Sequence, residues 1–251
     1  MPAPFTGVAV ALVSLFRDDG GLDADATAAH ARRLADAGIQ AVVVAGSTGE
    51  ASSLEPGERG RLLEAVGATV DVPLLCGTGA ASARQARALT EEAVAAGADG
   101  VLALSPPGGR GLAGYYQAVR EAAGALPVLA YHFPALAPPG VPVDQLELLP
   151  VDGLKDSSGD PMRLLAELDR LPGALYVGSP ALLSMAAGVG CAGAILALAN
   201  LDPEGCLEAF SGDHRAQRRP GRLALEAEED FPAGLKRLLS RRHGTSPVCR
   251  I

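Results

Sequence analysis

The chain shows its structural unit most plainly in Val151-Asp152-Gly153-Leu154-Lys155-Asp156-Ser157-Ser158-Gly159-Asp160. A short apolar run ends in a lysine, and a polar turn that contains a glycine follows it. Residues 161–170 then have the composition of a helix. The stretch predicts a strand over 151–155 that carries Lys155 at its carboxyl end, followed by a turn and a helix.

The same unit recurs along the whole chain. Its apolar runs are nearly continuous and do not alternate with polar residues, which is typical of a parallel sheet covered on both faces. We expect strands at 8–13, 40–45, 72–76, 99–104, 127–132, 151–155, 175–178 and 193–198. We expect helices that end at 37 and that span 55–70, 82–96, 112–123, 143–149, 161–170, 180–188 and 203–211.

Eight strand–helix units at intervals of roughly 20 to 33 residues predict an α/β fold, the (β/α)₈ or TIM barrel. An open doubly wound sheet is the alternative, although it normally has fewer strands for this length. The length of 251 residues suits one large α/β domain or two small ones. We expect a catalytic barrel over 1–212 and a short C-terminal helical extension over 213–251, with helices at 215–229 and 232–242.

The charge of the chain argues against several classes of partner. The formal net charge is −8, whereas nucleic acids and anionic membranes call for a basic surface. No apolar run approaches the roughly 18 residues of a membrane span. The segment before residue 8 lacks the basic residues of a signal peptide, so we expect a cytoplasmic protein.

The spacing of cysteines and histidines indicates no metal site. The cysteines form no CxxC pair, and we expect small buried side chains rather than disulfide partners at 76, 191, 206 and 249. The histidines are scattered at 30, 132, 214 and 243. The segment 77–82 is a near miss for a dinucleotide-binding GxGxxG, but the next strand does not end in the acid that would hold a ribose.

The two lysines stand out among the 21 basic residues, because all the others are arginines. Arginine stays protonated and cannot act where a neutral amine is needed. Lys155, at the end of a strand, therefore suggests amine chemistry, whereas Lys236 shows no such pattern. The alternative for Lys155 is an ordinary surface or ion-pair lysine.

In a barrel of this kind the chemistry lies on the loops after the strands. Ser47 and Thr48 follow the second expected strand between two glycines and could hold a carboxylate or phosphate, or merely form a tight turn. Tyr131 could be a core aromatic or could move protons for a nearby amine. His132 should point to the other side of its strand, where we expect a packing role.

Four motifs occur in a characteristic order: Gly-Ser-Thr-Gly-Glu at 46–50, Gly-Thr-Gly at 77–79, Tyr-x-x-Pro at 131–134, and Gly-Leu-Lys-Asp-Ser-Ser-Gly at 153–159. Together they resemble the dihydrodipicolinate synthase / N-acetylneuraminate lyase family of class I, Schiff-base aldolases. The resemblance extends over about residues 7 to 200. It implies a (β/α)₈ barrel, usually in a homo-oligomer such as a dimer or tetramer, that needs no metal or other cofactor.

The resemblance also implies a mechanism. A lysine forms an imine with pyruvate or another small-molecule 2-oxo acid, and burial favours its neutral form because the charged amine loses hydration. On this chain the implied imine lysine is Lys155, and the implied proton-relay tyrosine is Tyr131. The remaining implied residues are Ser47 and Thr48 for the carboxylate, with Gly178 and Ile195 lining the pyruvate pocket.

Departures from the family pattern narrow the expected reaction. The loop at 105–109 lacks the family's tyrosine, and the arginine that dihydrodipicolinate synthases carry is missing near Leu136. The Lys-Asp-Ser-Ser-Gly form favours an aldolase, a lyase, acting on a 4-hydroxy-2-oxo acid or a 2-keto-3-deoxy sugar acid. We expect Arg110 to bind the far end of the substrate, or else to be a solvated loop residue. The alternatives are a dehydratase or synthase that uses the same imine, and an inactive relative that only binds a ligand.

Overall fold

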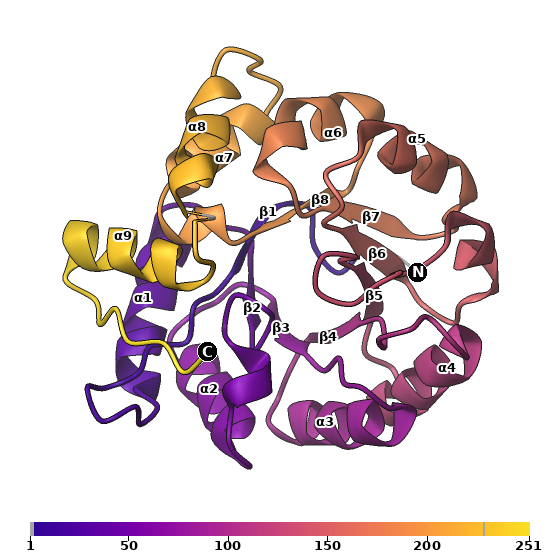
Figure 1. The fold of residues 1–251 in the computed structure, drawn as a ribbon, viewed down its shortest axis with the longest axis horizontal. Coiled ribbons are helices and arrows are strands. Elements are labelled where there is room, and N and C mark those ends of the chain that lie inside the picture. The colour runs from indigo at the N-terminus through magenta and orange to yellow at the C-terminus, as the bar shows by residue number, and fades with distance from the viewer. Residues whose placement is uncertain (1–2, 228) are drawn as a thin grey trace.

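The chain forms a closed barrel of eight parallel strands surrounded by helices (Figure 1), in a computed structural model that describes residues 3–227 and 229–251. Each strand pairs with the next along the chain, and β1 pairs with β8 to close the sheet. The strands are β1 (Gly7–Ala11), β2 (Ala41–Val44), β3 (Leu74–Gly77), β4 (Gly100–Leu104), β5 (Val128–His132), β6 (Gly153–Asp156), β7 (Ala174–Val177) and β8 (Gly193–Leu196). The predicted barrel is confirmed, and the doubly wound alternative is wrong.

The helices occupy the outside of the barrel. They are α1 (Ala24–Asp36), α2 (Glu58–Gly67), α3 (Ala83–Ala95), α4 (Leu112–Ala123), α5 (Pro161–Arg170), α6 (Leu183–Val189), α7 (Pro203–Phe210), α8 (Arg218–Ala227) and α9 (Ala233–His243). Short 3₁₀ turns are η1 (Ala51–Ser53), η2 (Val143–Leu148), η3 (Pro180–Leu182) and η4 (Leu198–Asn200). No helix within the described ranges is both long and apolar enough to cross a membrane.

Three helix predictions need correction, and in one of them residues 180–182 form the 3₁₀ turn η3 ahead of α6. The segment 143–149 is the 3₁₀ turn η2 rather than an α-helix, and it cannot continue because Pro150 forces Leu149 into an extended conformation. Helix α2 begins at Glu58 rather than at residue 55, because Gly57 has a φ of 80° and a left-handed residue cannot continue a right-handed helix.

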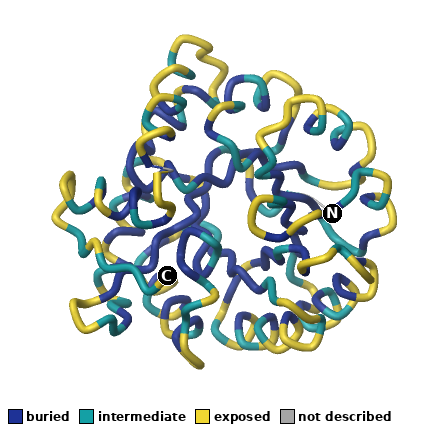
Figure 2. The backbone as a smooth tube through the Cα atoms, viewed as in Figure 1, coloured by how far each residue is buried: buried dark blue, intermediate teal, exposed yellow. Residues whose placement is uncertain are grey.

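The core has two layers, and the buried backbone runs around the centre of the molecule (Figure 2). Alternate strand residues such as Ala9 and Ala11 fill the barrel, while Val8 and Val10 pack outward against the helices. Phe5, just before β1, stacks on Tyr176 with 4.5 Å between the ring centres. These rings therefore occupy the barrel interior near the amino-terminal ends of the strands.

The last two helices and the tail after them extend across the barrel rim. Helix α8 packs on α7, η3 and η4, and α9 follows it on the same side (Figure 1). The tail then returns to α2, where the Arg250 guanidinium donates to the Glu58 carboxylate at 3.0 Å. The C-terminal segment therefore contacts both the loops around β8 and the region after β2.

Candidate active site

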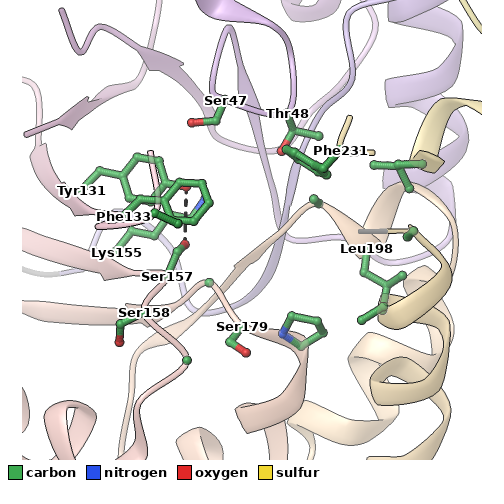
Figure 3. A pocket seen from close by; sticks show the side chains of 18 residues that line it. Ser47, Thr48, Tyr131, Phe133, Lys155, Ser157, Ser158, Ser179, Leu198 and Phe231 are labelled. Carbon is green, nitrogen blue, oxygen red and sulfur yellow. Dashed lines mark hydrogen bonds between the residues drawn. The ribbon is translucent and has the colours of Figure 1, made fainter. Parts of the chain in front are cut away.

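A cavity of about 420 Å³ lies at the carboxyl ends of the strands (Figure 3). It is lined by residues at or just after the carboxyl ends of β2, β5, β6, β7 and β8, and by residues of α8, α9 and the segment between them. Five predicted site residues meet there: Ser47, Thr48, Tyr131, Lys155 and Gly178. Residues far apart in the chain thus form one site because a closed parallel barrel brings all its strand ends to one rim.

Lys155 and Tyr131 are neighbours across two strands. They are paired in the register of β5 and β6, so both side chains project into the barrel. The Lys155 Nζ lies 4.2 Å from the centre of the Tyr131 ring, and Lys155 is only 5% exposed. Among the described residues, no carboxylate forms an ion pair with this amine, which leaves it directed at the cavity.

Gly178 is required by the close approach of the β6 residues. A Cβ atom at this position would lie 1.9 Å from the Ser157 Oγ and 3.0 Å from the Lys155 Cε. Even alanine would therefore displace the lysine or the serine. The Ser157 hydroxyl in turn donates to the Tyr131 hydroxyl at 3.4 Å (Figure 3).

Ser157 is a site residue that the sequence analysis did not single out. It lies two positions after Lys155, and the alternation of a strand places residues i and i+2 on the same face. That spacing was the available signal, but the turn residues after Lys155 looked like ordinary turn formers. The structure adds Ser157 to the pair formed by Lys155 and Tyr131.

The loop with Ser47 and Thr48 has an unusual backbone at both ends. Ala45 and Glu50 have φ angles of 51° and 54°, a region that costs non-glycine residues free energy. The Ser14 hydroxyl donates to the Gly49 carbonyl at 2.7 Å and holds the loop from below. The loop thereby turns both hydroxyl residues toward the cavity, where Thr48 is 4% exposed.

Lys236, the second lysine, helps to hold that loop. Its ammonium group forms an ion pair with the Glu50 carboxylate, and both side chains are 0% exposed. The same Nζ donates to the Val248 carbonyl at 2.9 Å and lies 4.4 Å from the centre of the Phe16 ring. The Arg250 backbone N–H also donates to the Glu50 carboxylate, at 2.7 Å, so the C-terminal tail is anchored beside the loop.

His132 has the packing role that was predicted. Its Nδ1 accepts a hydrogen bond of 2.9 Å from the Val141 backbone N–H on the outer side of β5. Burial, together with the nearby Arg163 charge, lowers the pKa of His132 to about 4. The imidazole is therefore neutral at pH 7 and lies behind the strand that carries Tyr131.

A buried carboxylate cluster lies behind β6. Asp156 points to the outer side, where burial raises its pKa and where Glu167 of α5 is close. Burial, and secondarily the charge of Asp156, raise the pKa of Glu167 to about 8. The Arg163 guanidinium lies 2.7 Å from the Glu167 carboxylate and opposes this shift.

Two predicted substrate-binding residues do not line the cavity of their own chain. Ile195 is fully buried in the barrel interior, where it packs in the same cluster as Tyr131. Arg110 is exposed in the loop after β4. The structure thus brings neither residue to the cavity surface that the described residues form.

The described residues that line the cavity include no histidine, cysteine, aspartate or glutamate. The described residues include no group of three or more histidines, cysteines, aspartates or glutamates positioned to hold a metal ion. The four cysteines are free, and three of them are buried. What the cavity offers is an amine beside a tyrosine hydroxyl, with a second set of hydroxyls from the loop after β2, an arrangement suited to a small carbonyl compound that carries a carboxylate.

Known proteins resemble this chain in sequence over most of its length. A sequence model of the "Dihydrodipicolinate synthetase family" matches residues 4–211. An uncharacterized DapA-like lyase of Halobacterium salinarum is 35% identical over 247 residues, which cover 94% of this chain and 81% of that protein. A 4-hydroxy-tetrahydrodipicolinate synthase of Natronomonas pharaonis is 32% identical over 212 residues, 80% of this chain and 72% of that protein.

Solved structures agree with the sequence relatives. YagE, a prophage protein from E. coli K12 that belongs to the dihydrodipicolinic acid synthase family and was solved in complex with pyruvate, has a TM-score of 0.90 and 25% identity. The alignment covers 98% of this chain and 91% of YagE. The 4-hydroxy-tetrahydrodipicolinate synthase of Methylacidiphilum fumariolicum SolV also has a TM-score of 0.90, with 26% identity over 98% of this chain and 89% of that one. The chain belongs to the dihydrodipicolinate synthetase family.

Proposed function

We propose that this protein is a Schiff-base aldolase that cleaves or forms the C3–C4 bond of a 4-hydroxy-2-oxo acid, a class that includes 2-keto-3-deoxy sugar acids. Pyruvate is the product of cleavage or the donor in condensation. The observation that carries the proposal is the buried Lys155 amine, which faces the cavity 4.2 Å from the centre of the Tyr131 ring. An amine in this position can attack a ketone held in the cavity.

The proposed reaction balances without a cofactor. The Lys155 amine adds to the C2 ketone, and water leaves to form a protonated imine. The imine accepts the electron pair of the C3–C4 bond while Tyr131 relays a proton: its oxygen accepts the proton of the C4 hydroxyl as its own proton passes to water, so an aldehyde leaves and an enamine remains. Protonation of the enamine at C3 and hydrolysis of the imine then release pyruvate and restore the lysine.

The loop after β2 supplies the proposed carboxylate site. Ser47 and Thr48 line the same cavity as Lys155 and offer hydroxyl and backbone donors. Holding the C1 carboxylate there would set the C2 ketone against the amine. Ser157 would hold the Tyr131 hydroxyl in place through the bond described above. The pyruvate complex of YagE supports a 2-oxo acid as the ligand of this cavity.

A synthase is the second candidate, because relatives of this chain bear that name. Formation of 4-hydroxy-tetrahydrodipicolinate from aspartate semialdehyde would require a cation for the distal carboxylate. The segment Ala135-Leu136-Ala137 lacks the arginine expected there, and Leu136 is exposed. Arg110 is also off the cavity of its own chain, so it would serve only a neighbouring copy in a homo-oligomer. We therefore favour the aldolase.

Trapping of the imine tests the proposal. The protein is incubated with pyruvate and borohydride, and its peptides are mapped by mass spectrometry. We expect a stable adduct on the peptide that contains Lys155. An unmodified Lys155, or an adduct confined to Lys236, would refute the mechanism. Omitting pyruvate provides the control for nonspecific labelling.

A further inference from the structure

The cavity has two chemically different sides. Figure 3 shows Leu198 and Phe231 across the cavity from Tyr131 and Lys155. The apolar side is completed by Ala224, Ala227 and Leu235 of the two C-terminal helices. Phe231 remains 38% exposed, so part of this ring faces open space rather than other protein atoms.

Charge is concentrated at one point of the cavity wall. Of the described residues that line it, Lys155 alone carries a charged side chain. The nitrogen of that amine becomes part of the imine in the proposed reaction, and the described residues of the apolar side include no second cation to receive a carboxylate. A carboxylate placed against this wall would lose hydration without gaining a partner, which is strongly unfavourable.

The remaining hydroxyl groups are already engaged in local turns. The Ser158 hydroxyl donates to the Asp156 carboxylate at 2.9 Å and accepts from the Asp160 backbone N–H at 3.1 Å. The Ser179 hydroxyl accepts from the Ala181 backbone N–H at 3.4 Å, where it caps η3. The Ser158 O–H is therefore occupied and the Ser179 O–H is left to donate, so the two serines together offer one donor to a chain of substrate hydroxyls.

The volume of the cavity exceeds the needs of pyruvate. Apolar cavities of about 150 Å³ hold a benzene molecule. The cavity here is about 420 Å³, which leaves room for a pyruvyl unit and a ring beside it. The small side chains of Ala224 and Ala227 preserve that room on the apolar side.

We propose that the aldehyde released or accepted by this enzyme carries a neutral, apolar group of up to aromatic size, seated against Phe231 and Leu198. The inference rests on the proposed aldolase function and narrows its substrate. In condensation, C3 of the pyruvate enamine forms a bond to the aldehyde carbon, and the aldehyde oxygen takes up a proton. The product is a 4-hydroxy-2-oxo acid with an apolar group on C4, and no further reactant is needed.

The test compares the cleavage of three substrates through the release of pyruvate. They are 4-hydroxy-2-oxo-4-phenylbutanoate, a 4-hydroxy-2-oxo acid with a distal carboxylate, and a 2-keto-3-deoxy sugar acid. We expect kcat/KM for the phenyl substrate to be at least tenfold higher than for the other two. Equal values, or preference for the acid or the sugar, would overturn the inference.

Two matched variants locate the selectivity. Phe231→Arg adds a cation to the cavity wall, whereas Leu225→Arg adds the same charge at a position of α8 that is 76% exposed and does not line the cavity. We expect Phe231→Arg to lower kcat/KM for the phenyl substrate at least tenfold and to raise it for the distal carboxylate. Leu225→Arg should change neither. Identical effects of both variants would contradict the assigned wall.

Borohydride trapping with pyruvate alone separates the two proposals. If Lys155 is trapped but the phenyl substrate is not cleaved, the aldolase proposal stands at its first step and the apolar substrate class is wrong. If no adduct forms on Lys155, the proposed function fails and the inference fails with it. An adduct on Lys155 together with a preference for the phenyl substrate supports both proposals.

Discussion

Lys155 and Lys236 have the same side chain and similar burial, at 5% and 0% exposed, yet they lie in contrasting surroundings. Each amine lies near an aromatic ring, 4.2 Å from the centre of Tyr131 and 4.4 Å from that of Phe16. Lys236 is paired with Glu50 and donates to the Val248 carbonyl. Lys155 faces a cavity and forms no ion pair with the described residues.

The difference teaches that burial alone does not make a lysine reactive. A carboxylate partner holds the amine in place through an ion pair, as Glu50 does for Lys236. An amine that lacks such a partner and faces a cavity is placed to attack a substrate held there. The partner, rather than the depth, separates the structural lysine from the proposed catalytic one.

The largest effect is expected from Lys155→Arg. Arginine keeps the charge but cannot form the imine, so we expect kcat/KM for the cleavage of a 4-hydroxy-2-oxo acid to fall by about 10⁴-fold or more. Thermal unfolding followed by circular dichroism should show that the variant is folded. A folded variant with activity near that of the parent would erase the contrast between the two lysines.

Lys236→Met should act on stability instead. The variant leaves the Glu50 carboxylate buried without its partner, and we expect the free energy of unfolding to fall by about 3–5 kcal/mol. Urea denaturation measures the change. The double variant Lys236→Met/Glu50→Gln should recover part of the loss, because the uncompensated charge is removed. A loss below about 1 kcal/mol in the single variant would show that the pair is not structural.

Tyr131→Phe tests the ring beside Lys155. In this variant Lys155 lies next to a phenylalanine ring without a hydroxyl, just as Lys236 lies next to Phe16. The ring stays beside the amine, but the proposed proton relay is lost. We expect kcat to fall by about 10²–10⁴-fold, with little change in the pyruvate-trapping yield on Lys155. A nearly normal kcat would return Tyr131 to a packing role.

The smallest effect concerns Glu167, a buried carboxylate whose charge is only partly compensated, in contrast to Glu50. Its pKa is raised from 4.5 to about 8, so between these values the folded protein holds a proton that the unfolded chain has released. Raising the pH through this window must therefore lower the free energy of unfolding. From pH 7 to 8.5 we expect a loss of about 1 kcal/mol.

Urea denaturation at several pH values checks this prediction, with Glu167→Gln as the control. The amide cannot titrate, so the variant should lose about 1 kcal/mol less stability than the parent between pH 7 and 8.5. The other titrating groups, which include the buried thiols of Cys76, Cys191 and Cys206, are the same in both proteins, so the difference between parent and variant isolates Glu167. A parent protein whose stability is constant over the same range would contradict the assignment.

Local sequence patterns were enough to predict much of the fold and part of the candidate site. All eight strands were predicted because continuous apolar runs and terminal glycines are signals within a few residues. Lys155 and Tyr131 were predicted to lie on neighbouring strands, and their register confirms it. The weakest predictions were helix starts and the segment 143–149, where prolines and the left-handed Gly57 outweighed the apolar pattern.

What the sequence by itself determined is therefore the barrel and the lysine at the end of β6, because both depend on short-range periodicity. Only the tertiary structure decided the partner of Lys236, since Glu50 lies 186 positions away in the chain and no local signal links the two. It also decided that Arg110 lies away from the cavity while Phe231 lines it. Contacts between distant segments depend on how helices close over the barrel, and that packing depends on the whole chain rather than on any one stretch.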